Sequence, residues 1–128
     1  MNKILIILTI LTSYVFSNDF FYIKDNQKIH LEKIQDISRA SSSVDYYKDE
    51  NNVVLGVNKN IILSLKEGTL VEKYLKLYDL EIEKKLDSNL FLVKTTNKSK
   101  TLEVSNELNR KNDVIFAQPD FVKEVFAR

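Results

Sequence analysis

The chain has 128 residues, of which 19 are Lys or Arg and 18 are Asp or Glu, so its formal net charge is +1. A chain of this length has room for one small domain, and its balanced charge gives no electrostatic reason to bind nucleic acid or an anionic membrane. Because it contains no cysteine, the domain must be held together by a hydrophobic core without disulfides.

Residues 1–17 have the pattern of a secretory signal peptide. Lys3 supplies the positive charge, residues 4–11 are an apolar run, and Val15 and Ser17 suit the −3 and −1 positions of a signal peptidase site. The alternative is an uncleaved anchor helix, but the apolar run is short for a bilayer span of ~20 residues. We therefore expect export to the periplasm or the medium, and no stable membrane insertion after cleavage.

Residues 18–34 predict a β-hairpin. Two β-prone runs flank Asp25 and Asn26, and both of these residues tolerate the left-handed conformation of a tight turn. An isolated hairpin is only marginally stable, so this one must dock on another part of the molecule. The following residues, 35–52, are polar and predict a linker.

Residues 53–128 predict an α+β domain. From Asn60 onward the expected order is strand, helix, strand, strand, helix, strand, which is the ferredoxin-like βαββαβ arrangement. It places two helices on one face of a four-stranded antiparallel sheet, and it leaves the other face to solvent, to the N-terminal hairpin or to a partner. The predicted strands are 60–65, 80–86, 90–93 and 114–117, and the predicted helices follow Thr69 and Ser99 or Thr101.

Helix start and end signals support these two helices. Thr69 and Glu72 form a predicted capping box at the start of the first helix, and this helix should end near Asp79. Asn112 is expected to adopt a left-handed conformation after the second helix. Apolar stripes at helical spacing predict the inward faces: Leu70, Tyr74 and Leu77 together with Val71, Leu75 and Tyr78 in the first helix, and Leu102, Ser105 and Leu108, flanked by Val104, in the second. The residues expected in the core are Ile62, Leu75, Phe91, Val93, Leu108 and Phe116.

The chain lacks the residues of common catalytic and metal sites. His30 is the one histidine, and the two glycines are too few for a Gly-x-Ser-x-Gly elbow, a P-loop or a Rossmann loop. Zinc sites need Cys or several His. Asp25, Asp45, Asp49 and Glu50 could form a weak calcium site, but their scatter favours a solvated loop. We therefore expect no catalytic residue, no cofactor and no metal.

Three segments, 60–68, 80–93 and 101–108, have apolar patterns that occur in this order in one protein family. They resemble the first strand, the central hairpin and the second helix in the N-terminal propeptides of bacterial subtilisin-like serine proteases. The hairpin at 22–31 is similar to an extra hairpin that some of these precursors carry. Taken together, the similar segments cover nearly all of the mature chain.

The closing strand of the predicted domain, 114–121, is similar to the same family. In the family this strand commonly reads as an apolar stretch followed by Ala-x-Pro-Asn and an aromatic residue. Ala117, Gln118, Pro119 and Asp120 occupy the motif here, with Asp120 in place of the usual asparagine.

The resemblance implies a binding protein that is not itself an enzyme. In the family the propeptide sheet packs on the catalytic domain, a serine endopeptidase, which it helps to fold and also inhibits. The tail lies in the substrate groove by strand addition. Relatives continue into that domain, whereas this chain stops at Arg128, which implies a truncated or stand-alone remnant. The groove residues implied by the resemblance are Phe121, Val122, Val125, Phe126, Ala127 and Arg128.

Two other functions stay open. One is an exported structural or interaction domain without a protease partner, and the other is an exported ferredoxin-like ligand sensor. RNA binding of the ferredoxin-like type is disfavoured, because no strand has the Lys/Arg-Gly-Phe pattern with stacking aromatics. Acylphosphatase-like chemistry is disfavoured because Arg39, Arg110 and Arg128 do not lie in a glycine-containing anion loop.

The mature protein is expected to begin at or near Asn18, because signal peptidase should cut after Ser17. The intact mass of the protein recovered from the cell envelope or from the medium checks this cleavage site. Cytoplasmic protein that retains Met1 would contradict the prediction of export.

Overall fold

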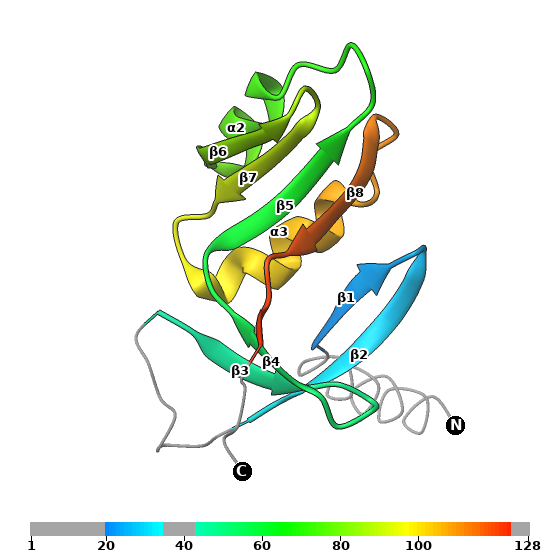
Figure 1. Ribbon diagram of the computed structural model, residues 1–128, viewed down its shortest axis with the longest axis vertical. Helices are drawn as coiled ribbons and strands as arrows, with labels where there is room; N and C mark the ends of the chain where they lie inside the picture. Colours follow the sequence, from blue (N-terminus) through cyan, green and yellow to red (C-terminus); the bar gives the residue numbers. More distant parts are fainter. Residues whose placement is uncertain (1–19, 35–42, 124–128) are drawn as a thin grey trace, which may run out of the picture.

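The computed structural model describes residues 20–34 and 43–123, which form an α+β fold with two antiparallel sheets (Figure 1). The predicted α+β class is therefore confirmed. One sheet has five strands and the other has four. The predicted signal peptide and its cleavage site lie outside the described residues.

The two sheets and the helices have the following bounds. The five-stranded sheet has the order β1 (Phe20–Lys24), β2 (Gln27–Lys33), β3 (Asp45–Lys48), β4 (Val54–Val57) and β9 (Val122–Lys123). The four-stranded sheet has the order β6 (Glu81–Asp87), β7 (Leu90–Lys94), β5 (Asn60–Leu65) and β8 (Val114–Pro119). The helices are α2 (Glu72–Tyr78), the short 3-10 helix η2 (Lys98–Lys100) and α3 (Thr101–Leu108).

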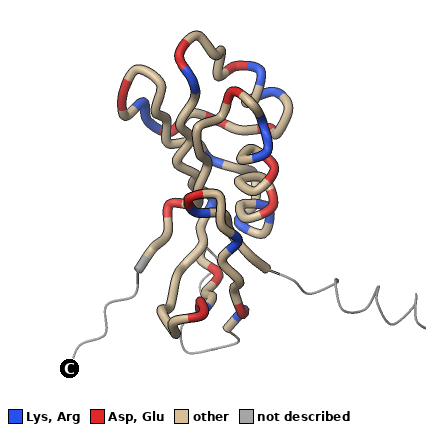
Figure 2. Tube along the Cα trace, turned by 90° about the vertical axis from the view of Figure 1, so that its right-hand side faces the viewer, with Lys and Arg blue, Asp and Glu red and all other residues tan. Residues whose placement is uncertain are grey.

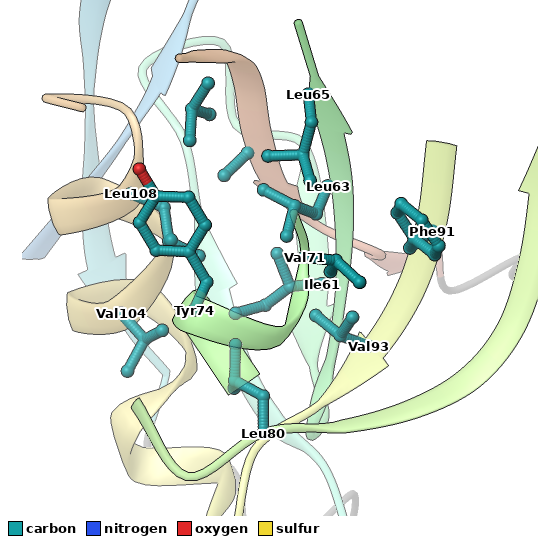
Figure 3. Close-up of a cluster of buried hydrophobic side chains, with 12 residues drawn as sticks. Ile61, Leu63, Leu65, Val71, Tyr74, Leu80, Phe91, Val93, Val104 and Leu108 are labelled. Carbon is teal, nitrogen blue, oxygen red and sulfur yellow. The ribbon is translucent and has the colours of Figure 1, made fainter. Parts of the chain in front are cut away.

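The first core cluster fills the space between the four-stranded sheet and its helices (Figure 3). Every second residue of β5 is buried, and Ile61, Leu63 and Leu65 are at most 1% exposed. Tyr74 of α2 and Leu108 of α3 lie over the strands from the helix side. The cluster consists of Ile61, Leu63, Leu65, Val71, Tyr74, Leu80, Phe91, Val93, Val104, Leu108, Val114 and Ala117.

The predicted core is confirmed at Phe91, Val93 and Leu108, which are 8%, 0% and 0% exposed. Leu75 is only partly buried, although it packs against the same cluster. The three confirmed residues lie on β7 and α3, where the spacing of apolar residues was sufficient to place them.

The core prediction is wrong at Ile62 and Phe116. Ile62 is only partly buried and Phe116 is 40% exposed. Successive strand residues point to opposite faces, so Ile62 must face away from the helices once Ile61 faces them. In β8 an irregularity opposite Ser64 and Leu65 shifts the register, and it places Phe116 on the same outer face.

Helix α2 begins without the predicted capping box. Its N-cap is Val71, in helical conformation and without a side-chain cap hydrogen bond. The Thr69 amide instead closes a turn onto the Lys66 carbonyl at 3.1 Å, and Gly68 in this turn has a φ of 89°. Thr69 belongs to this turn and lies two residues before the N-cap, so the Thr69 hydroxyl is not at the capping position.

The two predicted stripes of α2 are buried only in part. Val71 and Tyr74 are buried, whereas Leu70 and Leu77 are 71% and 61% exposed. The face that packs on the sheet therefore combines Val71 and Tyr74, one from each stripe, with Leu75 and Tyr78 partly buried beside them. The helix ends at Asp79 as predicted, with this residue in the left-handed region at a φ of 56°.

The prediction that Ser99 or Thr101 caps the second helix is wrong; this helical segment consists of η2 followed by α3. Asn97 caps the segment, because its side chain accepts a hydrogen bond from the Ser99 amide at 2.9 Å. Thr101 is fully buried and donates its hydroxyl to the Asn58 carbonyl at 2.6 Å. Asn112 is not among the residues with positive φ, so that prediction is also wrong. The predicted stripe is buried as expected, together with its neighbour: Leu102, Val104, Ser105 and Leu108.

The five-stranded sheet has its own core cluster and includes part of the predicted linker. The hairpin β1-β2 forms as predicted, with Asp25 and Asn26 at φ values of 51° and 64°. Within the predicted linker, however, β3 pairs with both β2 and β4. Its Tyr47 is 4% exposed and meets the Phe20 ring edge to face at 5.3 Å, and burial, reinforced by Asp45, raises the Tyr47 pKa to about 12. The cluster consists of Tyr22, Leu31, Tyr47, Leu55, Val57 and Leu102.

A polar contact ties α2 to the loop that precedes β8. The Tyr74 hydroxyl donates a hydrogen bond to Asp113, and Lys73 Nζ lies 2.5 Å from Asp113 Oδ2. Hydrogen bonds from Lys73 and then from Tyr74 hold the pKa of Asp113 below its ordinary value of 3.8. The ionised carboxylate therefore stabilises the folded chain.

Ile61→Ala is expected to lower the free energy of unfolding by ~2–5 kcal/mol, the range for large-to-small core substitutions. The matched substitution Ile62→Ala, one residue along β5 and on the opposite face, should cost clearly less because Ile62 is only partly buried. Urea denaturation of both variants measures the difference. Equal costs would contradict the register of β5.

Asp113→Asn is expected to destabilise the protein at neutral pH. Because the pKa of Asp113 is lower in the folded chain than in the unfolded chain, its stabilisation is present above about pH 4 and is lost as the pH falls through the folded-state pKa. The difference in melting temperature between the variant and the unmodified chain should therefore shrink in acid. Thermal denaturation across this pH range checks the effect, and a difference that stays constant would contradict it.

Candidate functional site

The outer face of the four-stranded sheet carries an apolar patch, and both helices lie behind the sheet in Figure 1. The register aligns Leu92, Ile62 and Gln118 in one row across β7, β5 and β8, and it aligns Leu90, Ser64 and Phe116 in the next row. These side chains alternate with the buried core residues, so they share the face that points away from the helices. We call this surface the open face: Ile62, Ser64, Leu90, Leu92, Phe116 and Gln118.

The open face is more exposed toward β8 than at its centre. Phe116 is 40% exposed, whereas Ile62, Leu90 and Leu92 are partly buried by one another and by their neighbours. Next to Phe116, a groove of about 350 Å³ separates β8 from the turn of the N-terminal hairpin. The exposed apolar surface is thus concentrated at Phe116, beside the partly buried Ile62, Leu90 and Leu92, and apolar surface patches are typical of sites that bind another molecule.

Asn109 holds the strand that carries Phe116 in place. Its carboxamide makes two hydrogen bonds with Ala117 of β8: the Ala117 amide donates to Asn109 Oδ1 at 2.9 Å, and Asn109 Nδ2 donates to the Ala117 carbonyl. The side chain thus acts like a neighbouring strand at this edge of the sheet. Ala117 itself is 1% exposed and faces the core, which orients Phe116 and Gln118 outward.

The sequence motif 117–120 marks the end of β8. Pro119 pairs with Ile61 as the last residue of the strand, and the Asp120 amide donates to the Asn60 carbonyl at 3.0 Å. Beyond this hydrogen bond the chain leaves the four-stranded sheet. The motif thus ends directly before Phe121, the first residue of the predicted C-terminal tail, 121–128.

The first residues of the tail contact the five-stranded sheet. The Phe121 ring packs edge to face on Tyr22 at a centroid distance of 4.8 Å and contacts the second core cluster. Val122 and Lys123 pair with Gly56 and Leu55 of β4. Of the predicted groove residues, Phe121 and Val122 thus contact the chain itself, while Val125, Phe126, Ala127 and Arg128 lie outside the described residues.

The N-terminal hairpin docks on helix α3. Asn106 Nδ2 donates to the Phe21 carbonyl at 2.9 Å. A hollow of about 380 Å³ lies beside this contact, between the rings of Phe20 and Phe21 and the polar side of α3. Asn106 Oδ1 is buried there with no hydrogen-bond partner among the described residues. This contact satisfies the expectation that the hairpin docks on the rest of the molecule.

The candidate titratable residues do not come together. His30 is exposed, and its backbone amide donates to Glu50 Oε2 at 3.1 Å. Asp49 accepts the amides of Asn51 and Val53 at 2.8 and 2.9 Å, so it stabilises a turn. Asp45 pairs with Lys98 at 3.0 Å. Across residues 20–34 and 43–123, no group of three or more His, Cys, Asp or Glu could hold a metal ion.

The charged residues of both signs are interspersed along the described chain (Figure 2). Neither Lys and Arg nor Asp and Glu gather on one face in this view. No helix in the described part of the chain is both long enough and apolar enough to cross a bilayer.

Comparison of the chain with known proteins gives no match, whether to a family model, to a curated protein or to a solved structure.

Two residues near the tail have roles that the sequence patterns did not predict. Asn109 holds the edge of β8, and Gly56 lies where β4 meets the tail. No local signal distinguishes Asn109 from other polar residues at a helix end. Gly56 does carry a signal, because a glycine inside a β-prone run often marks the close approach of another backbone.

Proposed function

We propose that the chain is a propeptide-type module that binds the catalytic domain of a subtilisin-like serine protease, assists its folding and inhibits it. In this proposal the module is exported and supplies binding surfaces, while all catalytic groups belong to the protease. The open face and the tail are the two surfaces that make contact. The observation that carries the proposal is that β8, the edge strand of a sheet with an apolar outer face, leads through Phe121 directly into β9, and most of the predicted groove residues follow β9 in the sequence.

A ferredoxin-like arrangement of the scaffold is part of the proposal. The chain order β5-α2-β6-β7-α3-β8 and the sheet order β6-β7-β5-β8 support it, because a split βαβ fold has this order of elements and antiparallel neighbours. Such a sheet has two helices on one face, which leaves the other face available to a partner. The sequence resemblance to subtilase propeptides is consistent with the same arrangement.

The open face has the chemistry of an interface core. Ile62, Leu90 and Leu92 form its apolar centre, Phe116 adds an exposed aromatic ring at one side, and Ser64 and Gln118 add polar groups. Aromatic residues are enriched in the buried centres of interfaces, whereas charged residues such as Lys84 and Asp87 of β6, which pair with Leu92 and Leu90, are typical of the rim. A stable complex buries ~1,600 Å² in total, so the sheet face and the tail would together contribute the module's share.

Folding assistance follows from the nature of the proposed partner. Subtilisin-like domains are large parallel α/β folds whose contacts are mostly non-local, and such folds form slowly. A module that binds the partly formed protease lowers the barrier if it binds the transition state more tightly than the unfolded chain. The tail then inhibits by occupying the groove as an added strand, with alternate side chains entering pockets.

Phe116→Asp on the open face is expected to raise the inhibition constant against a subtilisin-like protease of the same organism about tenfold or more, equivalent to ~1.4 kcal/mol per decade. Deleting residues 124–128 should weaken inhibition by a similar factor, because it removes the predicted groove contacts. Leu77→Asp is the matched control, since Leu77 is 61% exposed on α2, behind the sheet. It should leave inhibition unchanged.

Circular dichroism and melting temperatures establish that all three variants remain folded. Inhibition equal to that of the unmodified chain by both Phe116→Asp and the deletion variant would contradict the two proposed contact surfaces. If the unmodified chain inhibits no subtilisin-like protease, the proposal fails, and an exported interaction domain without a protease partner becomes the better interpretation.

A further inference from the structure

Gly56 has no conformational reason to be glycine. It lies inside β4, and Gly68 is the one glycine of the chain with a positive φ. An ordinary residue could therefore adopt the backbone conformation of Gly56. Glycine in a strand interior weakens the strand, so its presence there points to a need for space.

The space beside Gly56 is taken up by the tail and by two side chains. A Cβ atom on Gly56 would lie 3.0 Å from the carbonyl oxygen of Val122, 2.8 Å from Val44 Cγ1 and 3.1 Å from Tyr46 Cε1. The contacts with Val44 and Tyr46 involve side chains, which would have to shift to make room. The Val122 oxygen belongs to the backbone of the strand that pairs with Gly56, so it can move only together with that strand. A side chain at position 56 would therefore push β9 away from β4.

We propose that the five-stranded sheet holds the first residues of the C-terminal tail, 121–123, in a fixed position. Gly56 leaves room for the backbone of these residues, and Tyr22 anchors Phe121. We call residues 121–123 the tail root and the contacts that hold them the clamp. The clamp is a property of this chain alone. Its consequence for a protease, which is that the segment entering the groove starts from a fixed point at Lys123, rests on the proposed function above.

The contacts of the clamp come from both ends of the described sequence. Tyr22 belongs to the first strand, and its ring meets Phe121 at 4.8 Å. Val122 and Lys123 extend the same sheet at its far side, next to β4. In Figure 1 the segment after β8 runs from the four-stranded sheet to β4 and crosses between the two sheets.

Each half of the clamp needs the other. A pairing of two residues at the edge of a sheet is too short to be stable by itself. Burial of the Phe121 ring against Tyr22 and the second cluster supplies the additional apolar contact. Upstream, the hydrogen bond from the Asp120 amide to Asn60 fixes the other end of the crossing. The tail root is therefore held at three successive points.

Holding the tail root reduces the entropy that is lost on binding. A flexible segment must be ordered when it enters a groove, and a segment that starts from a fixed point loses less freedom. The N-terminal hairpin and β3 would thus affect inhibition without touching the protease. Gly56 and Tyr22 are positioning residues in this account.

A thermodynamic cycle tests the clamp without any protease. Four mature chains are compared: unmodified, Gly56→Ala, a chain ending at Asp120, and the combination of the two changes. Gly56→Ala should lower the melting temperature of the full chain. In the shortened chain it should lower the melting temperature by clearly less, because the contact with the Val122 oxygen is gone. The contacts with Val44 and Tyr46 occur in both backgrounds and cancel. An equal decrease in both backgrounds would overturn the clamp.

A second measurement keeps the test decisive if a shortened chain does not fold. Phe121→Ala in the full chain should speed trypsin cleavage after Lys123, because the anchor of β9 is lost, and mass spectrometry identifies the first product. Leu70→Ala is the matched control, since Leu70 is 71% exposed just before α2 and is not among the residues of the second core cluster or those packed against it. Cleavage after Lys123 at the same rate in all chains would overturn the clamp.

The effect of the clamp on protease inhibition is tested separately, by measuring inhibition constants. Gly56→Ala should raise the inhibition constant of the full chain about tenfold, equivalent to ~1.4 kcal/mol. It should have no further effect in a chain that lacks residues 124–128. If the unmodified chain inhibits and Gly56→Ala inhibits equally well, the role of the clamp in inhibition is refuted while the proposed function stands. If the unmodified chain inhibits nothing, the proposed function fails, and the melting and trypsin measurements still decide the clamp.

Discussion

Strand β5 is the element on which the rest of the structure depends, because it pairs with β7 on one side and with β8 on the other. Its inward residues, Ile61, Leu63 and Leu65, are almost completely buried and form the centre of a core that no disulfide supports. The same alternation turns Ile62 and Ser64 to the opposite side. The core and the open face are thus two consequences of one strand, since neither can change register without the other.

The second constraint is that the two ends of the described chain share one sheet. Strands β1 to β4 come from the N-terminal part, and β9 follows the last strand of the other sheet. Phe121 packs against a cluster whose other apolar contacts come from residues 20–57 and Leu102. The N-terminal strands therefore have a structural role beyond their own sheet, because they hold residues 121–123 in position.

The candidate site was only partly predictable. The motif 117–120 marked the end of β8, and apolar residues near it indicated a strand. The exposure of Phe116 was not predictable, because it follows from a register irregularity opposite Ser64 and Leu65. The role of Asn109 depends on a contact with Ala117 across the fold, and local sequence carries no sign of it. The partner of Gly56 is more than sixty residues away, so its importance appears only when both strands are in place.

The sequence by itself determined the α+β class, the order of strands and helices from Asn60 onward, the hairpin turn at Asp25 and Asn26, and the inward stripe of the second helix. These features follow from local periodicity and turn chemistry, which act over a few residues. Only the tertiary structure decided the strand β3, the start of α2, which of Ile61 and Ile62 faces the helices, and the path of the tail. Each of these depends on pairing or packing between segments far apart in the chain, and such contacts can stabilise a polar strand such as β3 or displace a capping residue such as Thr69, whatever its local preference.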